Sequence, residues 1–125
     1  YVKQANVFAH LPHLSTLSWP PIVRNRHKYQ TGYVLGYGGS KTYSGAPKLS
    51  SLAAFRAGAG LVRLFYPDDA APNMANTFPE VIHSSWDETA WQEEVQKASS
   101  LFIGPGLGKK ADINKWGSKY LRGVH

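Results

Sequence analysis

The sequence contains no cysteine, so disulfides, cysteine metal ligands and a cysteine nucleophile are excluded, and a cytoplasmic location is expected. No apolar run approaches the roughly 20 residues that a helix needs to span a bilayer, so no membrane association is expected. The first 67 residues contain eight lysines and arginines but no aspartate or glutamate. Such a basic half suits an anionic partner, for example a nucleotide, or else forms a solubilising surface.

Several familiar motifs are missing as well. No Lys/Arg run, RNP pattern or zinc-finger pattern occurs, so nucleic acid is not an expected partner. No HExxH-like spacing occurs among the histidines and acidic residues, so no metal site is predicted from the residues. The dinucleotide pattern GxGxxG fails because Lys41 stands where the third glycine would follow Gly36 and Gly38. The Walker pattern fails because Gly45 is followed by Ala46.

The sequence does have apolar runs of strand length that alternate with helical segments. We expect strands at 33–37, 61–66 and 101–103, with a shorter candidate at 81–83. A helix is expected over 87–99, with Asp87 as its N-cap. The remaining helical predictions are a helix or irregular crossing at 69–77 and a last helix at 113–121. This alternation predicts an α/β domain with a mainly parallel sheet.

A further helix is expected to have Pro47 in its first turn and to end before Gly58 and Gly60. Because apolar residues occupy much of the circumference of this helix, it should be well buried. The domain is expected to cover residues 32–125. Residues 1–31 contain three prolines and have mixed polarity, and they are interpreted as a lead-in segment or linker.

Two glycine-rich loops, "GGSKTYSGAP" and "IGPGLGK", follow predicted strands. In an open parallel sheet, ligands bind beyond the carboxyl ends of the strands, where both loops would lie. The first loop also leads into a helix N-terminus, whose free N–H groups favour a phosphate. A loop of this kind, taken alone, is more often a plain turn than a ligand site. Together they predict that Gly45, Ala46 and 104–108 line a cofactor site, whereas Gly58 and Gly60 are structural.

The order and spacing of several segments resemble the NAD(P)H-hydrate dehydratase family of the ribokinase-like superfamily. The resemblance covers about 80 residues and is carried by "HKYQTGYVLGYGGS" (27–40), "YSGAP" (43–47), "AAFRAGAGLV" (53–62), "FPEV" (78–81) and "LFIGPGLG" (101–108).

The resemblance implies a three-layer αβα ribokinase-like fold and a repair reaction, the dehydration of (S)-NAD(P)HX to NAD(P)H. The implied co-substrate is ADP or ATP, with Mg²⁺. In the family, the damaged cofactor contacts the alanine of "SGA" and the "GPGLG" loop. Those positions are Ala46, beside Gly45, and Gly104, Gly106 and Gly108. Glu80 is a weaker candidate, which either holds a ribose hydroxyl or caps a backbone N–H.

One departure from the family is large. The family's catalytic aspartate lies in a Gly-x-Gly-Asp segment, and no aspartate of this sequence has that context. The sequence therefore resembles the N-terminal half of the domain, contains no predicted catalytic residue and is expected to be inactive alone. A homo-oligomer is expected, and an epimerase domain could precede Tyr1. The alternatives are another ribokinase-like small-molecule kinase or a non-catalytic nucleotide-binding protein.

Overall fold

The computed structural model describes residues 18, 21, 25, 27 and 30–109. Most of the predicted lead-in segment and the predicted helix at 113–121 lie outside the described residues. The elements follow one another as β1 (Tyr33–Tyr37), α1 (Gly45–Arg56), β2 (Leu61–Tyr66), the 3₁₀ helix η2 (Asp68–Ala70), α2 (Ala71–Met74), β3 (Ile82–Ser85), α3 (Glu88–Lys97) and β4 (Ser100–Ile103). Among the described residues, no helix has the length and apolar character that crossing a membrane requires.

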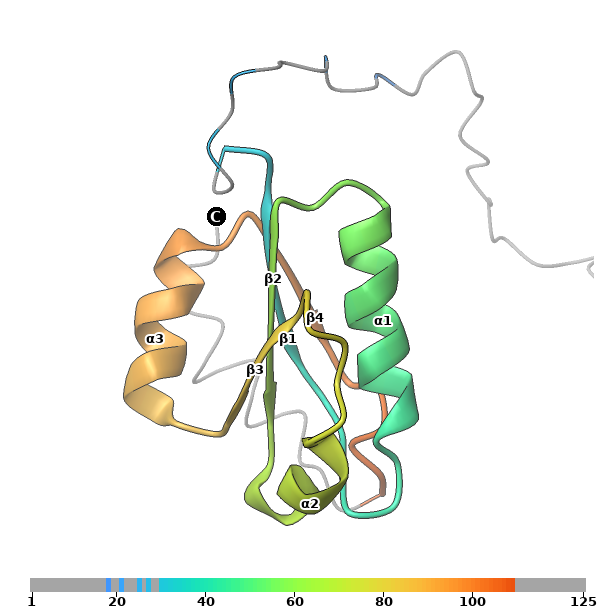
Figure 1. The fold of residues 1–125 in the computed structure, drawn as a ribbon. Helices are drawn as coiled ribbons and strands as arrows, with labels where there is room; N and C mark the ends of the chain where they lie inside the picture. Colours follow the sequence, from blue (N-terminus) through green and yellow to red (C-terminus); the bar gives the residue numbers. More distant parts are fainter. Residues whose placement is uncertain (1–17, 19–20, 22–24, 26, 28–29, 110–125) are drawn as a thin grey trace, which may run out of the picture.

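The four strands form one parallel sheet in the order β3-β2-β1-β4. Helix α1 covers one face of this sheet and α3 covers the other, so the described residues form three layers (Figure 1). The predictions of a parallel sheet and an αβα arrangement are therefore confirmed. The strands lie where the apolar runs predicted them, although β3 begins at Ile82 and extends to Ser85.

The α3 face contains the larger aromatic core. Phe65 of β2 and Trp91 of α3 are fully buried, and their rings meet edge to face with centroids 5.6 Å apart. The ring centroid of Trp86, just before α3, lies 5.5 Å from that of Trp91. The predicted N-cap is also present, because the Asp87 carboxylate accepts a hydrogen bond of 2.7 Å from the Ala90 N–H. Capping and aromatic packing together fix where α3 begins and which side faces the sheet.

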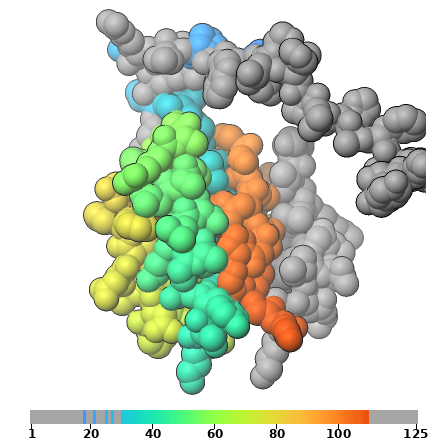
Figure 2. Space-filling model, turned by 90° about the vertical axis from the view of Figure 1, so that its right-hand side faces the viewer, coloured from blue at the N-terminus to red at the C-terminus, as the bar shows by residue number. Residues whose placement is uncertain are grey.

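Helix α1 is less buried than its composition predicts. Only Pro47 and Ser51 are buried, whereas Leu49 is 64% exposed and Phe55 is 36% exposed. Small side chains face the sheet, so the helix approaches closely and its larger apolar residues point away. The exposed side of α1 lies next to β4 in the space-filling view (Figure 2). The prediction of a well-buried helix was therefore wrong, because apolar content alone does not show which face is covered.

A polar cluster joins α3 to the sheet near the amino end of β1. The Tyr33 hydroxyl donates a hydrogen bond to the Glu94 carboxylate, and Arg63 Nε lies 3.8 Å from the same carboxylate. Burial, followed by the interaction with Glu94, raises the pKa of Tyr33 well above its usual value. Burial alone would raise the pKa of Glu94, but the Tyr33 hydrogen bond and the charges of Arg63 and Lys97 lower it overall.

The folded state therefore favours the ionised form of Glu94, and its contribution to stability should be lost as the pH falls below the ordinary value of 4.5. Glu94→Gln in the full-length protein should lower the free energy of unfolding at neutral pH by about 1–3 kcal/mol. It should also flatten the acid limb of the stability curve. Urea unfolding across this pH range tests both expectations. Glu93→Gln, on the exposed side of α3, is the matched control, and an equal loss in both variants would contradict this role of Glu94.

Candidate functional site

The two glycine-rich loops lie side by side at the carboxyl edge of the sheet. We call them the β1 loop (38–44) and the β4 loop (104–108). Tyr37 and Ile103, the last residues of β1 and β4, are register partners. Beyond them, the Gly39 N–H donates to the Pro105 carbonyl over 2.8 Å, and the Gly104 N–H donates to the Tyr37 carbonyl over 3.1 Å. Main-chain hydrogen bonds therefore join the two loops directly.

This close contact explains two of the glycines. A Cβ atom on Gly38 would lie 2.5 Å from the Pro105 carbonyl oxygen and 3.0 Å from Pro47 Cβ. Gly106 has a φ of +73°, and a Cβ atom there would collide with the carbonyl oxygen of Tyr43. Neither position has room for a side chain, so the loops can meet backbone to backbone only because both residues are glycine.

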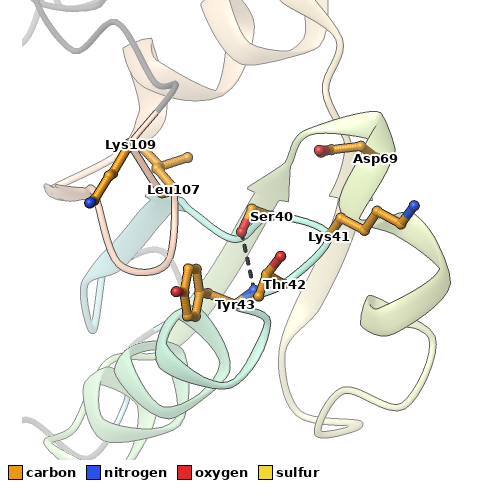
Figure 3. Close-up of a pocket in the computed structure, with 8 residues that line it drawn as sticks. Ser40, Lys41, Thr42, Tyr43, Asp69, Leu107 and Lys109 are labelled. Carbon is orange, nitrogen blue, oxygen red and sulfur yellow. Dashed lines mark hydrogen bonds between the residues drawn. The ribbon is translucent and has the colours of Figure 1, made fainter.

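An open pocket of about 410 Å³ lies where the two loops meet (Figure 3). Its walls come from the β1 loop, the start of η2 and the end of the β4 loop. The lining residues are Ser40, Lys41, Thr42, Tyr43, Asp69, Leu107, Gly108 and Lys109. Two lysines and one aspartate give this lining a positive formal charge, which suits an anionic ligand.

Hydrogen bonds hold the β1 loop in one shape. Ser40 Oγ accepts from the Tyr43 N–H over 3.1 Å, and the Ser40 N–H donates to the Tyr43 carbonyl over 3.3 Å. Asn73 of α2 donates through Nδ2 to the Lys41 carbonyl over 2.6 Å. Lys48 Nζ of α1 donates to the Asn73 carbonyl, also over 2.6 Å. The pocket wall is thus tied to both α1 and α2 before any ligand binds.

The N-terminus of α1 opens beside this pocket. Ser44 is the N-cap, but its side chain makes no capping hydrogen bond, and the first turn contains no acidic residue. Gly45 and Ala46 are exposed, and Pro47 has no N–H group to satisfy. The first N–H groups of a helix have no partner within the helix and carry the positive end of its dipole. This helix end can therefore accept a phosphate or another anion through its backbone.

The structure brings most of the predicted site residues to one edge of the sheet. Gly45 and Ala46 begin α1, and the three glycines of the β4 loop lie opposite them, with Gly108 in the pocket wall. Glu80 does not join them. It precedes β3, and Arg63 near the start of β2 pairs with Ile82, so Glu80 lies at the amino edge of the sheet. Glu80 lies just before the amino end of β3, whereas the pocket lies at the carboxyl edge of the sheet.

The predicted division of roles among the glycines needs one change. Gly58 has a φ of +110° directly after α1, which fits the predicted helix-ending role. Gly106, predicted to line the cofactor site, packs against the Tyr43 carbonyl. A valine at Gly106 should therefore destabilise the fold more than one at Gly58, where no atom lies within 4 Å of the position that a Cβ would occupy. The sequence assigns the structural role to Gly58 and the ligand-lining role to Gly106, which implies the opposite order of stabilities.

The two glycine-rich loops predicted from the sequence contain every residue of the pocket lining except Asp69, but of that lining only Leu107 and Gly108 were individually assigned to the site. Lys41, Thr42, Tyr43 and Lys109 lie in irregular loops, where periodicity gives no signal. Asp69 could have been found, because it follows the carboxyl end of β2 and the strand-end rule applies to it as well. Of the described residues that line the pocket, Asp69 is the only acidic one, and the described part of the chain contains no cluster of three or more metal-ligating side chains.

Comparison with known proteins gives this pocket a family context. A family model described as NAD(P)H-hydrate dehydratase matches residues 34–123. The chain belongs to the NAD(P)H-hydrate dehydratase family. It is 35% identical over 96 residues to an "ATP-dependent (S)-NAD(P)H-hydrate dehydratase" of Danio rerio, covering 73% of this chain and 29% of that protein. It is 31% identical over 126 residues to a Drosophila melanogaster protein of the same name, covering 94% of this chain and 42% of the relative.

A bacterial relative agrees with this family assignment, and a solved structure agrees with the ribokinase-like fold. The "Bifunctional NAD(P)H-hydrate repair enzyme Nnr" of Dictyoglomus turgidum is 34% identical over 110 residues, which are 78% of this chain and 21% of that protein. A ribokinase-like superfamily protein from Enterococcus faecalis superposes with a TM-score of 0.67 at 26% identity, covering 84% of this chain and 37% of the other. The chain thus spans less than half the length of each of these dehydratase-family relatives.

The loop contact in this dehydratase-family chain predicts a difference between two glycines. Gly38→Ala in the full-length protein should lower the free energy of unfolding by about 1–3 kcal/mol, because the new methyl group would press on the Pro105 carbonyl. Gly45→Ala should be neutral or stabilising by up to about 1 kcal/mol, since its position is open and helical. Neither position has a positive φ. Urea unfolding of both variants decides the matter, and equal stabilities would show that the loops do not need this contact.

Proposed function

We propose that the complete protein is an ADP- or ATP-dependent (S)-NAD(P)H-hydrate dehydratase of nicotinamide nucleotide repair, and that this chain supplies part of its cofactor site. The observation that carries the proposal is the meeting of two glycine loops beside the uncapped start of α1, within a chain that the family model matches over residues 34–123. A dinucleotide offers a pyrophosphate, and backbone N–H groups at strand-to-helix turns are suited to bind it.

In the proposed reaction, the hydroxyl on the hydrated nicotinamide ring loses its proton and attacks the terminal phosphoryl group of the nucleotide, which leaves as ADP or AMP. Phosphate then leaves the ring with the C–O bonding electrons. Loss of a ring proton restores the dihydronicotinamide. In this scheme the Gly45 and Ala46 N–H groups hold a phosphate of the dinucleotide. Lys41 and Lys109 attract the anionic ligand, and the β4 loop lets it approach the main chain closely.

The names of the Danio rerio and Drosophila melanogaster relatives favour ATP as the phosphoryl donor. Mg²⁺ bound with a nucleotide usually takes one or two carboxylates in addition to the phosphates. Asp69 is the pocket carboxylate that could serve as such a ligand. The Mg²⁺ would neutralise charge on the transferred phosphoryl group.

The activity test is direct. Full-length protein should convert NADHX to NADH, seen as recovery of the near-ultraviolet absorbance of NADH, when ATP or ADP is supplied. The 125-residue chain alone should give no turnover, because none of its aspartates lies in a Gly-x-Gly-Asp segment. The proposal would be refuted if the full-length protein neither bound NADHX nor restored NADH in the presence of ATP or ADP.

A charge placed at the start of α1 tests the phosphate assignment. Ala46→Asp should lower kcat/KM for NADHX at least about tenfold, which corresponds to about 1.4 kcal/mol, because its carboxylate repels the phosphate. The melting temperature should not fall, since an acidic residue in the first turn stabilises a helix. Ala53→Asp, exposed in the middle of the same helix, is the control and should retain activity. Normal kinetics for Ala46→Asp would place the phosphate elsewhere.

A further inference from the structure

Tyr43 is an exposed aromatic residue in the wall of the pocket. It is 59% exposed, whereas several large rings of the sheet and α3, such as Tyr33 and Trp91, are fully buried. A single exposed aromatic residue needs no explanation by itself. Among the described residues, Leu49 is the other large apolar residue that is more than half exposed, but unlike Tyr43 it does not line the pocket.

The backbone of Tyr43 is held on both sides although its ring is exposed. Its N–H donates to Ser40 Oγ and its carbonyl accepts from the Ser40 N–H. The same carbonyl packs against Gly106, where a Cβ atom would not fit. Because the backbone is already fixed, a ligand that covers the ring has only the side-chain torsions of Tyr43 to order, which lowers the entropic cost of binding.

The Tyr43 ring lies between the start of α1, which suits a phosphate, and the β4 loop, which allows a ligand to approach the main chain closely (Figure 3). Figure 3 shows Tyr43 between the start of α1 and the β4 loop, with Lys109 on the far side of that loop. Gly45 and Ala46 follow Tyr43 by two and three residues, so a phosphate at the helix end would be a near neighbour of the ring.

We propose that Tyr43 is a stacking platform for the adenine ring of a nucleotide whose phosphate binds at the start of α1. This inference rests on the proposed function and makes Tyr43 a binding-specificity residue of the same site. A base has a planar π face, and stacking on an aromatic side chain gives affinity without depending on hydrogen bonds. In the scheme proposed above, that nucleotide is NAD(P)HX; ADP and ATP also carry adenine and are the other source of the ring that the experiment distinguishes.

The experiment uses the full-length protein and measures the dissociation constants of NADHX and of ADP separately by calorimetry. Tyr43→Ala should weaken one of these ligands about tenfold. Tyr43→Phe should retain the affinity because it keeps the ring, whereas Tyr43→Leu should lose it because it keeps only apolar bulk. Leu49→Ala is the matched control, since it truncates an exposed apolar residue outside the pocket and should change neither constant. The ligand that responds identifies which adenine is stacked.

Other outcomes overturn the inference. Unchanged affinities in Tyr43→Ala would show that no base stacks there, and an equal loss in Tyr43→Phe would assign the effect to the hydroxyl. Full affinity in Tyr43→Leu, with a lowered melting temperature in Tyr43→Ala, would make the residue a packing element covered by the rest of the protein. If the wild-type protein dehydrates NADHX while Tyr43→Ala binds normally, only this inference fails. If the wild-type protein binds neither ligand, the proposed function fails as well.

Discussion

The contact between two stretches of main chain at the carboxyl edge of the sheet determines the rest of the site. Gly39 donates to the Pro105 carbonyl, and Gly106 lies against the Tyr43 carbonyl. The contact requires β1 and β4 to be neighbours, which the strand order β3-β2-β1-β4 provides. It also fixes where α1 begins. The pocket is consequently built on main chain that is held in place, and the first N–H groups of α1 beside it are the donors that suit a phosphate-containing ligand.

The close packing of α1 on the sheet also places the start of this helix beside the β4 loop. Pro47 and Ser51 are the buried residues of this helix, and Pro47 lies beside Gly38 in the loop contact. A bulkier face would hold α1 further from the sheet and separate its first N–H groups from the β4 loop. The larger residues of α1 are consequently displaced to the outer face, where Leu49 remains exposed. The burial of α1 and the position of its N-terminal end are thus linked.

The sequence predicted the regular elements well because their signals are local. The strands are short apolar runs between turn residues, and Asp87 has the chemistry of an N-cap. It predicted that two glycine loops share an edge, since parallel strands end on the same side. It could not show that Gly106 packs against Tyr43, because that contact joins residues far apart in the chain. It also overestimated the burial of α1, because the face of this helix that is covered depends on how closely the helix packs on the sheet.

Hydrogen–deuterium exchange of the full-length protein with and without NADHX tests most directly whether the two loops form the cofactor site. Bound NADHX should slow exchange at the amides of Gly45 and Ala46 and in the β4 loop, because these N–H groups are covered by the ligand. Exchange at Gly58 and Gly60, at the other end of α1, should not change. Protection that leaves both loops unaffected while appearing elsewhere in the protein would contradict the assignment of this edge as the binding site.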